Sequence, residues 1–162
     1  MRCPPALASL VEGGVFTRVD IGCSRASVFR IAGSGRPTLF LKSAPVAQCV
    51  GLIHEAERLR WLDGKLAVPR VHSFSVENDW EYLLMTGLAG LNGVDAGRDD
   101  PNAVVLGLAE ALRRWHAQPV AGCPFDETLE LQIARAREHV RSGLVDESDF
   151  DDERRGRTAS VF

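Results

Sequence analysis

Short runs of β-branched and aromatic residues, separated by turn residues, dominate the first half of the chain. Five such runs occur, at residues 15–19, 26–31, 38–42, 70–76 and 81–85. Most of the connections between them are short, whereas a parallel crossover needs about a dozen residues or more. Neighbouring runs are therefore predicted to pair as antiparallel hairpins, and the pattern as a whole predicts a five-stranded antiparallel sheet.

A stretch with helical periodicity, from about residue 47 to residue 66, interrupts these strands. At about 100° per residue its apolar side chains form one stripe, which contains Leu52, Ala56, Leu59, Leu62 and Leu66. Glu55 falls within that stripe, whereas Glu57 lies roughly opposite it. Because a carboxylate on a packing face is unfavourable unless it is paired, Glu55 is expected to meet a cation on the sheet that the helix covers.

Lys42, in the third predicted strand, is the available cation. Side chains alternate between the two faces of a strand, so Phe40 and Lys42 share one face and Leu39 and Leu41 share the other. Kinases use a strand lysine paired with a glutamate on the following helix to hold the α- and β-phosphates of ATP. Two interpretations remain open: this ion pair, or a surface lysine together with a glutamate that reaches water at the edge of its stripe.

The second half of the chain has helical periodicity. Pro101, preceded by two aspartates, is a typical helix start, and apolar residues recur at helical spacing from Val105 to Trp115. A second helix is predicted at about residues 128–142. The fold class is therefore α+β, with a β-rich lobe that contains one helix over residues 1–88, a glycine-containing linker over 89–97, and the first helices of a helical lobe over 98–162.

Composition and charge are those of an ordinary soluble protein, with 25% charged residues and a net charge of −3. This balance favours neither nucleic acid nor an anionic membrane as a partner. The sequence contains no apolar window of the ~18 residues that span a membrane and no signal-peptide pattern, so a cytoplasmic location is expected. The four cysteines have neither CxxC nor metal-binding spacing, so reduced thiols are expected rather than disulfides or a metal site.

Four stretches of the sequence resemble the aminoglycoside 3′-phosphotransferase family, which has a fold like that of the eukaryotic protein kinases. They are LFLKS around Lys42, HEAERLRWLDGKLAVPRV from His54, EYLLMTGLAG from Glu81 and LRRWHAQPVAGCPF from Leu112. A fifth stretch, GLVDESDFDDER from Gly143, is similar to the acidic insertion of the family. The stretches follow one another in the family order and cover nearly the whole chain, so the resemblance implies a kinase-like lobe followed by part of a helical lobe.

The resemblance also implies roles for individual residues around bound ATP. Lys42 would bind the α- and β-phosphates, Glu55 would orient Lys42, and Phe40 would stack on the adenine ring. Met85 would be the gatekeeper of the adenine pocket. The other implied contacts are the backbone of Thr86 and Leu88 at the adenine edge, and Ser24 near the β-phosphate, in a turn that could equally be an ordinary hairpin. The implied cofactor is ATP, with Mg²⁺ in complete members of the family.

Six of the eight residues from 146 to 153 are acidic and none is basic. Such a run is usually a solvated loop, and its spacing does not match an EF-hand. The resemblance instead places it in the loop that lines the antibiotic pocket, where clustered carboxylates would attract the ammonium groups of an aminoglycoside and bind them through charged hydrogen bonds. The substrate-binding residues implied in this way are Asp146, Asp149, Asp151, Asp152 and Glu153.

The His-Gly-Asp loop that supplies the catalytic base in the family does not occur in this sequence, and neither does its later metal-binding aspartate motif. None of the four histidines is followed by Gly-Asp. The resemblance therefore implies an aminoglycoside O-phosphotransferase, which transfers the γ-phosphate of ATP to an antibiotic hydroxyl and confers resistance, truncated before its catalytic loop and inactive alone. The alternative is a non-catalytic kinase-fold remnant that at most binds nucleotide. In both cases the apolar stripes of the two C-terminal helices predict self-association.

Overall fold

The computed structural model describes residues 4–21, 26–48 and 51–145. These residues belong to two compact units, of which the first ends at Pro119 and the second begins at Val120. The first unit contains the β-sheet and helices α1 to α4, and the second contains helix α5.

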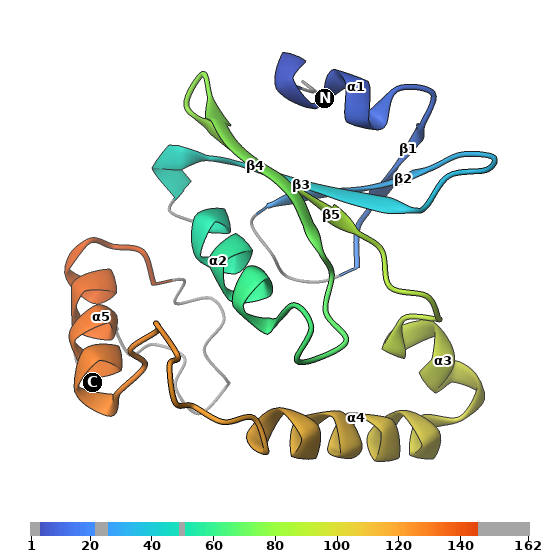
Figure 1. Ribbon diagram of the computed structural model, residues 1–162. Coiled ribbons are helices and arrows are strands. Elements are labelled where there is room, and N and C mark those ends of the chain that lie inside the picture. Colours follow the sequence, from blue (N-terminus) through green and yellow to red (C-terminus); the bar gives the residue numbers. More distant parts are fainter. Residues whose placement is uncertain (1–3, 22–25, 49–50, 146–162) are drawn as a thin grey trace. The chain divides into compact units, whose positions relative to one another are not determined.

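The first unit is built on a five-stranded antiparallel sheet with the strand order β1-β2-β3-β5-β4 (Figure 1). Its strands are β1 (Val15–Val19), β2 (Ser27–Ala32), β3 (Leu39–Pro45), β4 (Val71–Glu77) and β5 (Trp80–Thr86). All four neighbouring pairs among the described strands are antiparallel, so the predicted sheet is confirmed. Strand β3 pairs with β2 on one side and β5 on the other, which places Lys42 at the centre of the sheet.

The strands β3 and β5 are longer than the sequence pattern predicts. Strand β3 continues past Lys42 to Pro45, because its last residues stay paired with the start of β5. The turn between β4 and β5 consists of Asn78 and Asp79, whose φ angles are 50° and 62°. A two-residue turn with positive φ at both central positions matches the right-handed twist of the flanking strands, so β5 begins directly after it at Trp80.

The two faces of the sheet carry separate apolar clusters, as the alternation along β3 predicts. Leu39 and Leu41 belong to the cluster that joins the sheet to helix α1, together with Leu7, Val11, Ile31, Tyr82 and Leu84. Phe40 packs against the other cluster, which joins the sheet to helix α2 and contains Ala26, Ala44, Leu52, Ala56, Leu83 and Met85. Helices α1 and α2 therefore cover opposite faces of the sheet (Figure 1).

Helix α2 (Leu52–Leu62) is shorter than the predicted helix at residues 47–66. Gly51 occupies its N-cap position with a φ of 73°, a left-handed conformation that glycine adopts readily and that does not continue a right-handed helix. The residues before it form a separate 3-10 helix, η1 (Val46–Gln48). Within α2 the apolar stripe is placed as predicted, with Leu52, Ala56 and Leu62 buried.

Helix α1 (Pro5–Val11) is not predicted by the sequence pattern. It has only 7 residues, lacks a side-chain cap at its N-terminus, and buries two residues, Leu7 and Val11. The guanidinium group of Arg36, from the turn between β2 and β3, donates hydrogen bonds to two carbonyl oxygens at the end of α1. These carbonyls have no partner within the helix, so a distant part of the chain holds α1 in place.

Helix α3 (Gly93–Asp99) lies mostly within the predicted linker, and helix α4 (Pro101–His116) follows it. Both helices have polar caps, because Asn92 accepts a hydrogen bond from the Asp95 amide and Asp100 accepts one from the Ala103 amide. The apolar stripe predicted for α4 is between 43% and 64% exposed, at Val105, Leu108, Leu112 and Trp115. Within the described residues this face of α4 is therefore largely open.

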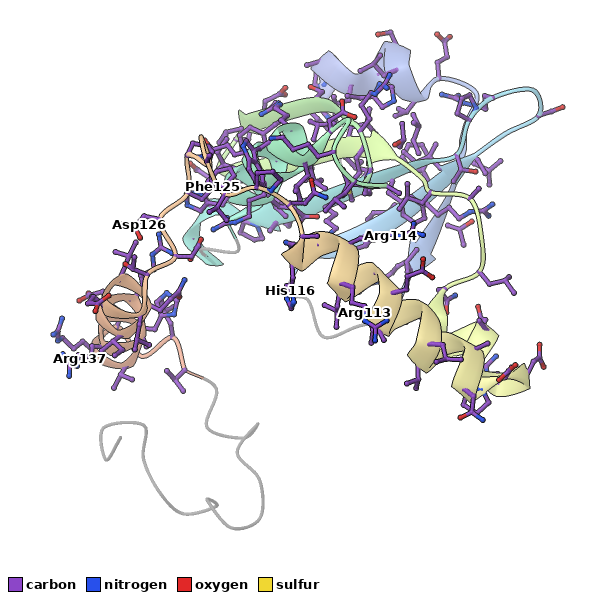
Figure 2. The ribbon with its side chains drawn as sticks, turned by 60° about the horizontal axis from the view of Figure 1, so that its bottom comes forward. Arg113, Arg114, His116, Phe125, Asp126 and Arg137 are labelled. Carbon is purple, nitrogen blue, oxygen red and sulfur yellow. The ribbon has the colours of Figure 1, made fainter. Side chains whose placement is uncertain are left out.

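In the second unit, helix α5 (Leu129–Arg141) confirms the predicted helix at residues 128–142 to within one residue at each end. Asp126 accepts a hydrogen bond from the Thr128 amide at 3.0 Å just before the helix, and this bond holds the pKa of the Asp126 carboxyl below its ordinary value. Figure 2 shows Asp126 and Arg137 of this unit, and it shows Arg113, Arg114 and His116 projecting from the last turns of α4.

Candidate nucleotide-binding site

Lys42 and Glu55 form an ion pair on the face of the sheet that α2 covers. The Lys42 Nζ atom donates to Glu55 Oε1 at 2.7 Å and to Oε2 at 3.0 Å. The two side chains are 23% and 34% exposed, so the pair is half-buried rather than on the open surface. The predicted pairing is therefore confirmed, and the interpretation of two separate solvated side chains is wrong.

The local structure explains why these two groups meet. Lys42 lies opposite Val28 of β2 and Leu83 of β5 in the sheet register, and alternation directs it to the same face as Phe40. Glu55 lies in the first turn of α2, directly before the fully buried Ala56. A carboxylate is also favoured at this position because the N-terminal end of a helix carries partial positive charge. The packing of α2 on the sheet thus holds the carboxylate over the lysine.

Phe40 and Met85 lie beside the ion pair on the same face of the sheet. They are directly opposite each other in the register of β3 and β5, and Met85 is 6% exposed. A Cβ atom at Gly87 would lie 3.0 Å from the Phe40 ring and 3.2 Å from Thr38, so glycine lets the chain leave β5 close to the ring without displacing these neighbours. The structure therefore brings Phe40, Lys42 and Met85 to one face of the sheet, as strand alternation predicts for the first two and the family resemblance implies for Met85.

Thr86 and Leu88 mark the place where the chain leaves the sheet. The Thr86 amide donates to the Arg70 carbonyl at 2.9 Å, and the Thr86 hydroxyl accepts a hydrogen bond from the Arg70 amide at 2.8 Å. The Gly87 amide donates to the Thr38 carbonyl at 2.8 Å. Leu88 follows β5 with its side chain 56% exposed. Its backbone therefore follows these hydrogen-bonded residues, just beyond the end of β5 where Met85 lies opposite Phe40 of β3.

Several predicted contacts lie outside the described residues. Ser24, predicted near the β-phosphate, is one of them, and the others are the predicted antibiotic-binding carboxylates Asp146, Asp149, Asp151, Asp152 and Glu153. Among the residues that are described, no cluster of three or more histidine, cysteine or acidic side chains could hold a metal ion. The described helices include none with the length and apolar character needed to cross a membrane.

One contact of this region is missed by the sequence reasoning. A carboxylate oxygen of Glu81, on β5, accepts a hydrogen bond from the Leu52 amide at the start of α2, at 3.1 Å. The two residues are 29 positions apart, so neither strand alternation nor helix periodicity reveals the contact. Alternation along β5 places Glu81 on the same face as Leu83 and Met85, but it does not identify Leu52 as the partner.

Comparison with known proteins gives one family. Residues 15–161 match the model of the phosphotransferase enzyme family. An aminoglycoside 3′-phosphotransferase of Escherichia coli is 34% identical over 148 residues, which are 89% of this chain and 55% of the relative. Streptomycin 3″-kinase of Streptomyces griseus is 35% identical over 134 residues, which are 82% of this chain and 48% of the relative.

Solved structures agree with this result. An aminoglycoside-3′-phosphotransferase of type VIII superposes with a TM-score of 0.79 at 34% identity, covering 96% of this chain and 58% of the other. An aminoglycoside phosphotransferase of Streptomyces rimosus, in complex with ADP and streptomycin, gives a TM-score of 0.73 at 26% identity. The chain spans about half the length of the curated relatives it matches. The resemblance stated from the sequence is confirmed, and the chain belongs to the phosphotransferase enzyme family.

Proposed function

We propose that the sheet and helix α2 form the nucleotide-binding lobe, residues 1–88, of an ATP-dependent aminoglycoside O-phosphotransferase. The observation that carries this proposal is the ion pair between Lys42 and Glu55, at 2.7 Å on the face of the sheet that also presents Phe40. The lysine ammonium group is a compact positive charge suited to phosphate oxygens. Glu55 holds that charge at one position above β3, so that it does not have to be ordered when the nucleotide arrives.

The neighbouring residues fit the rest of a nucleotide. The Phe40 ring, on the Lys42 side of β3, supplies an apolar surface for the adenine ring. Met85 is the proposed gatekeeper residue of the adenine pocket. The carbonyl of Thr86, whose amide is bonded to Arg70, and the backbone of Leu88 beyond β5 would provide hydrogen-bonding groups for the adenine edge. Ser24 would add a hydroxyl near the β-phosphate. The described residues offer no ligand set for Mg²⁺, so the proposal concerns nucleotide binding by protein groups.

The proposed second substrate is an aminoglycoside. The relatives are described as aminoglycoside 3′-phosphotransferases and a streptomycin kinase, and one related structure is a complex with ADP and streptomycin. The chemistry of residues 146–153 supports the same substrate class, because six carboxylates within eight residues favour a ligand with several ammonium groups. Phosphoryl transfer itself also requires positioning of the acceptor hydroxyl and stabilisation of charge on the phosphoryl group.

A second candidate is a kinase-fold chain that binds nucleotide without transferring phosphate. The observation that favours it is the lack of a His-Gly-Asp motif in these 162 residues. Both candidates require the nucleotide site around Lys42, and they differ in whether antibiotic-dependent turnover accompanies binding. A test of the nucleotide site therefore comes first.

The lysine content of the chain allows a direct test. The sequence contains two lysines, Lys42 and Lys65. Lys65 is exposed, with its Nζ atom 3.7 Å from the centre of the Trp61 ring and bonded to the Trp61 carbonyl. An acyl-phosphate derivative of ATP transfers its acyl group to a lysine amine that lies beside the bound phosphates. Mass spectrometry of the labelled chain then reports on both lysines in one sample.

The expected result is that Lys42 is acylated and that excess ATP suppresses this labelling, while any labelling of Lys65 is the same with and without ATP. Lys65 thus serves as the internal control for reagent concentration and general reactivity. Labelling of Lys42 that ATP does not suppress, or suppression that is equal at both lysines, would contradict the proposed nucleotide site.

A further inference from the structure

Glu81 links strand β5 to the beginning of helix α2. Its carboxylate accepts a hydrogen bond from the Leu52 amide at 3.1 Å, in partly buried surroundings. Leu52 is the first residue of α2, and the first amides of a helix have no acceptor within the helix itself. The negative charge of Glu81 also lies at the positive end of the helix dipole, where it is favourable.

Among the described residues, no neighbour of α2 along the chain provides this cap. The N-cap position is occupied by Gly51, which has no side chain, and no side-chain capping hydrogen bond is formed at that position. The acceptor for the Leu52 amide comes instead from the sheet. Since Gly51 is in the left-handed conformation and the preceding 3-10 helix η1 ends at Gln48, the regular geometry of α2 begins at the residue that Glu81 holds.

The position of Glu81 connects this anchor to the ion pair. In the sheet register Glu81 lies opposite Ala44, two residues along each strand from the pair Leu83 and Lys42. Residues two apart share a face, so Glu81 points to the side of the sheet that carries Lys42. On the helix, the anchored Leu52 is three residues before Glu55, which is about 4.5 Å along the axis.

We propose that Glu81 is a positioning residue for the nucleotide site, which fixes the start of α2 on the sheet and thereby sets the position of Glu55 relative to Lys42. The inference rests on the proposed function, because it assigns the purpose of the Lys42–Glu55 pair to nucleotide binding. A rotation or shift at the first turn of α2 would move the Glu55 carboxylate away from the lysine. Glu81 prevents that movement through its hydrogen bond with the Leu52 amide, which involves neither Lys42 nor the nucleotide.

The test compares Glu81→Ala, Glu81→Gln and the control Glu57→Ala, which removes an exposed carboxylate of α2 whose partner is His54. Loss of a helix cap weakens the first turn, so Glu81→Ala should weaken ATP binding by about three- to tenfold. Glu81→Gln keeps an oxygen acceptor for the Leu52 amide and should bind ATP within about twofold of the unchanged chain. Glu57→Ala should leave the affinity unchanged.

A double substitution separates positioning from general stability. If Glu81 acts through Glu55, adding Glu81→Ala to Glu55→Ala should not weaken ATP binding further, because the group that was positioned is already gone. Additive losses of affinity would overturn the proposal. Equal losses for Glu81→Ala and Glu81→Gln would also overturn it, because the capping oxygen would then not matter.

A measurement without nucleotide keeps this test apart from that of the proposed function. The carboxylate of Glu55 shields the Lys42 amine, so Glu81→Ala should raise acylation of Lys42 by a simple activated ester relative to Lys65 in the same chain. Glu57→Ala should not change that ratio. An unchanged ratio in Glu81→Ala refutes the positioning role whatever the nucleotide does. The ratio could also rise although ATP fails to protect Lys42 from labelling. That result would support the positioning role of Glu81 and refute only the proposed nucleotide site.

Discussion

Glu55 and Glu57 are two residues apart on the same helix, and the structure gives them different surroundings. Glu55 meets Lys42 on the half-buried face of α2, whereas Glu57 meets His54 in solvent. Glu55→Gln and Glu57→Gln remove the same charge from the same helix with almost no change in size. Their effects on ATP binding therefore isolate the contribution of the ion pair from that of net charge or helix stability.

The expected magnitude follows from the geometry of the pair. An exposed ion pair contributes about 0.2–1 kcal/mol to the stability of a folded protein, and a hydrogen bond to a charged group contributes about 1.5–3 kcal/mol. The Lys42–Glu55 pair has hydrogen-bonding distances of 2.7 and 3.0 Å, and its side chains are 23% and 34% exposed, so it lies between these limits. A loss of about 1–2 kcal/mol corresponds to ATP binding that is about 5- to 30-fold weaker in Glu55→Gln.

The control should behave differently. The Glu57 side chain is 48% exposed, and its nearest carboxylate oxygen lies 3.4 Å from the His54 ring nitrogen. Surface substitutions of this kind usually change the free energy of unfolding by no more than about 0.5 kcal/mol, and Glu57 lies away from the proposed nucleotide site. Glu57→Gln should therefore bind ATP within about twofold of the unchanged chain.

Isothermal titration calorimetry with ATP on the purified chain and both variants measures these affinities, and thermal unfolding of the same samples shows whether each variant is folded. Equal weakening of ATP binding by Glu55→Gln and Glu57→Gln, or no effect of Glu55→Gln in a folded chain, would contradict this prediction. In either case the face of α2 that carries Glu55 would have no special part in holding the nucleotide.

Three further predictions concern the rest of the chain. A polypeptide of residues 1–162 should show no aminoglycoside-dependent consumption of ATP, since its sequence holds no His-Gly-Asp motif; steady phosphorylation of kanamycin in a coupled assay would contradict this. The exposed apolar stripe of α4 should make the chain bind a hydrophobic dye or self-associate. The double variant Leu108→Glu with Trp115→Glu should lower dye binding, measured by fluorescence, and self-association, measured by light scattering. An unchanged chain that is monomeric and binds no dye would indicate that this stripe of α4 is covered. In a complete relative that carries residues 146–153, the carboxylates Asp149, Asp151, Asp152 and Glu153 can be replaced by their amides. This change should raise KM for the antibiotic by about tenfold or more, less so at high salt, and should leave KM for ATP nearly unchanged. An unchanged antibiotic KM would identify the run as a solvated loop.

The ion pair at the centre of the site can be predicted from the sequence because both of its members obey simple periodicities. Alternation along β3 assigns Lys42 and Phe40 to one face, and the 3.6-residue period of α2 places Glu55 on the packing face. Burial of Leu39 and Leu41 on the opposite side agrees with this assignment. Local pattern is sufficient here because each side chain needs only to be assigned to one face of its own strand or helix.

The sequence pattern fails where long-range contacts decide the structure. Helix α1 is too short to be stable by itself and depends on Arg36 and the sheet. Helix α2 starts after Gly51, whose backbone is left-handed, and its first amide is bonded to Glu81. Neither feature changes the spacing of the apolar residues from which the helix is predicted. Helix α3 is concealed by the glycines of its segment, which suggest a linker, although Asn92 caps it. For α1 and α2 the deciding partners, Arg36 and Glu81, lie far along the chain, whereas the cap of α3 is local and is concealed by the glycine content of its segment.

Arg36 and helix α1 have a practical consequence for anyone who shortens or fuses this protein at its start. Leu7 is completely buried and Val11 is 6% exposed, so deletion of α1 would leave Leu39, Leu41 and Leu84 in contact with water. Uncovered apolar surface on a sheet promotes aggregation. A version of the sheet-containing lobe designed for crystallisation or NMR should therefore keep residues 5–11 and Arg36, and a purification tag attached at the start should be separated from Pro5 by a flexible spacer.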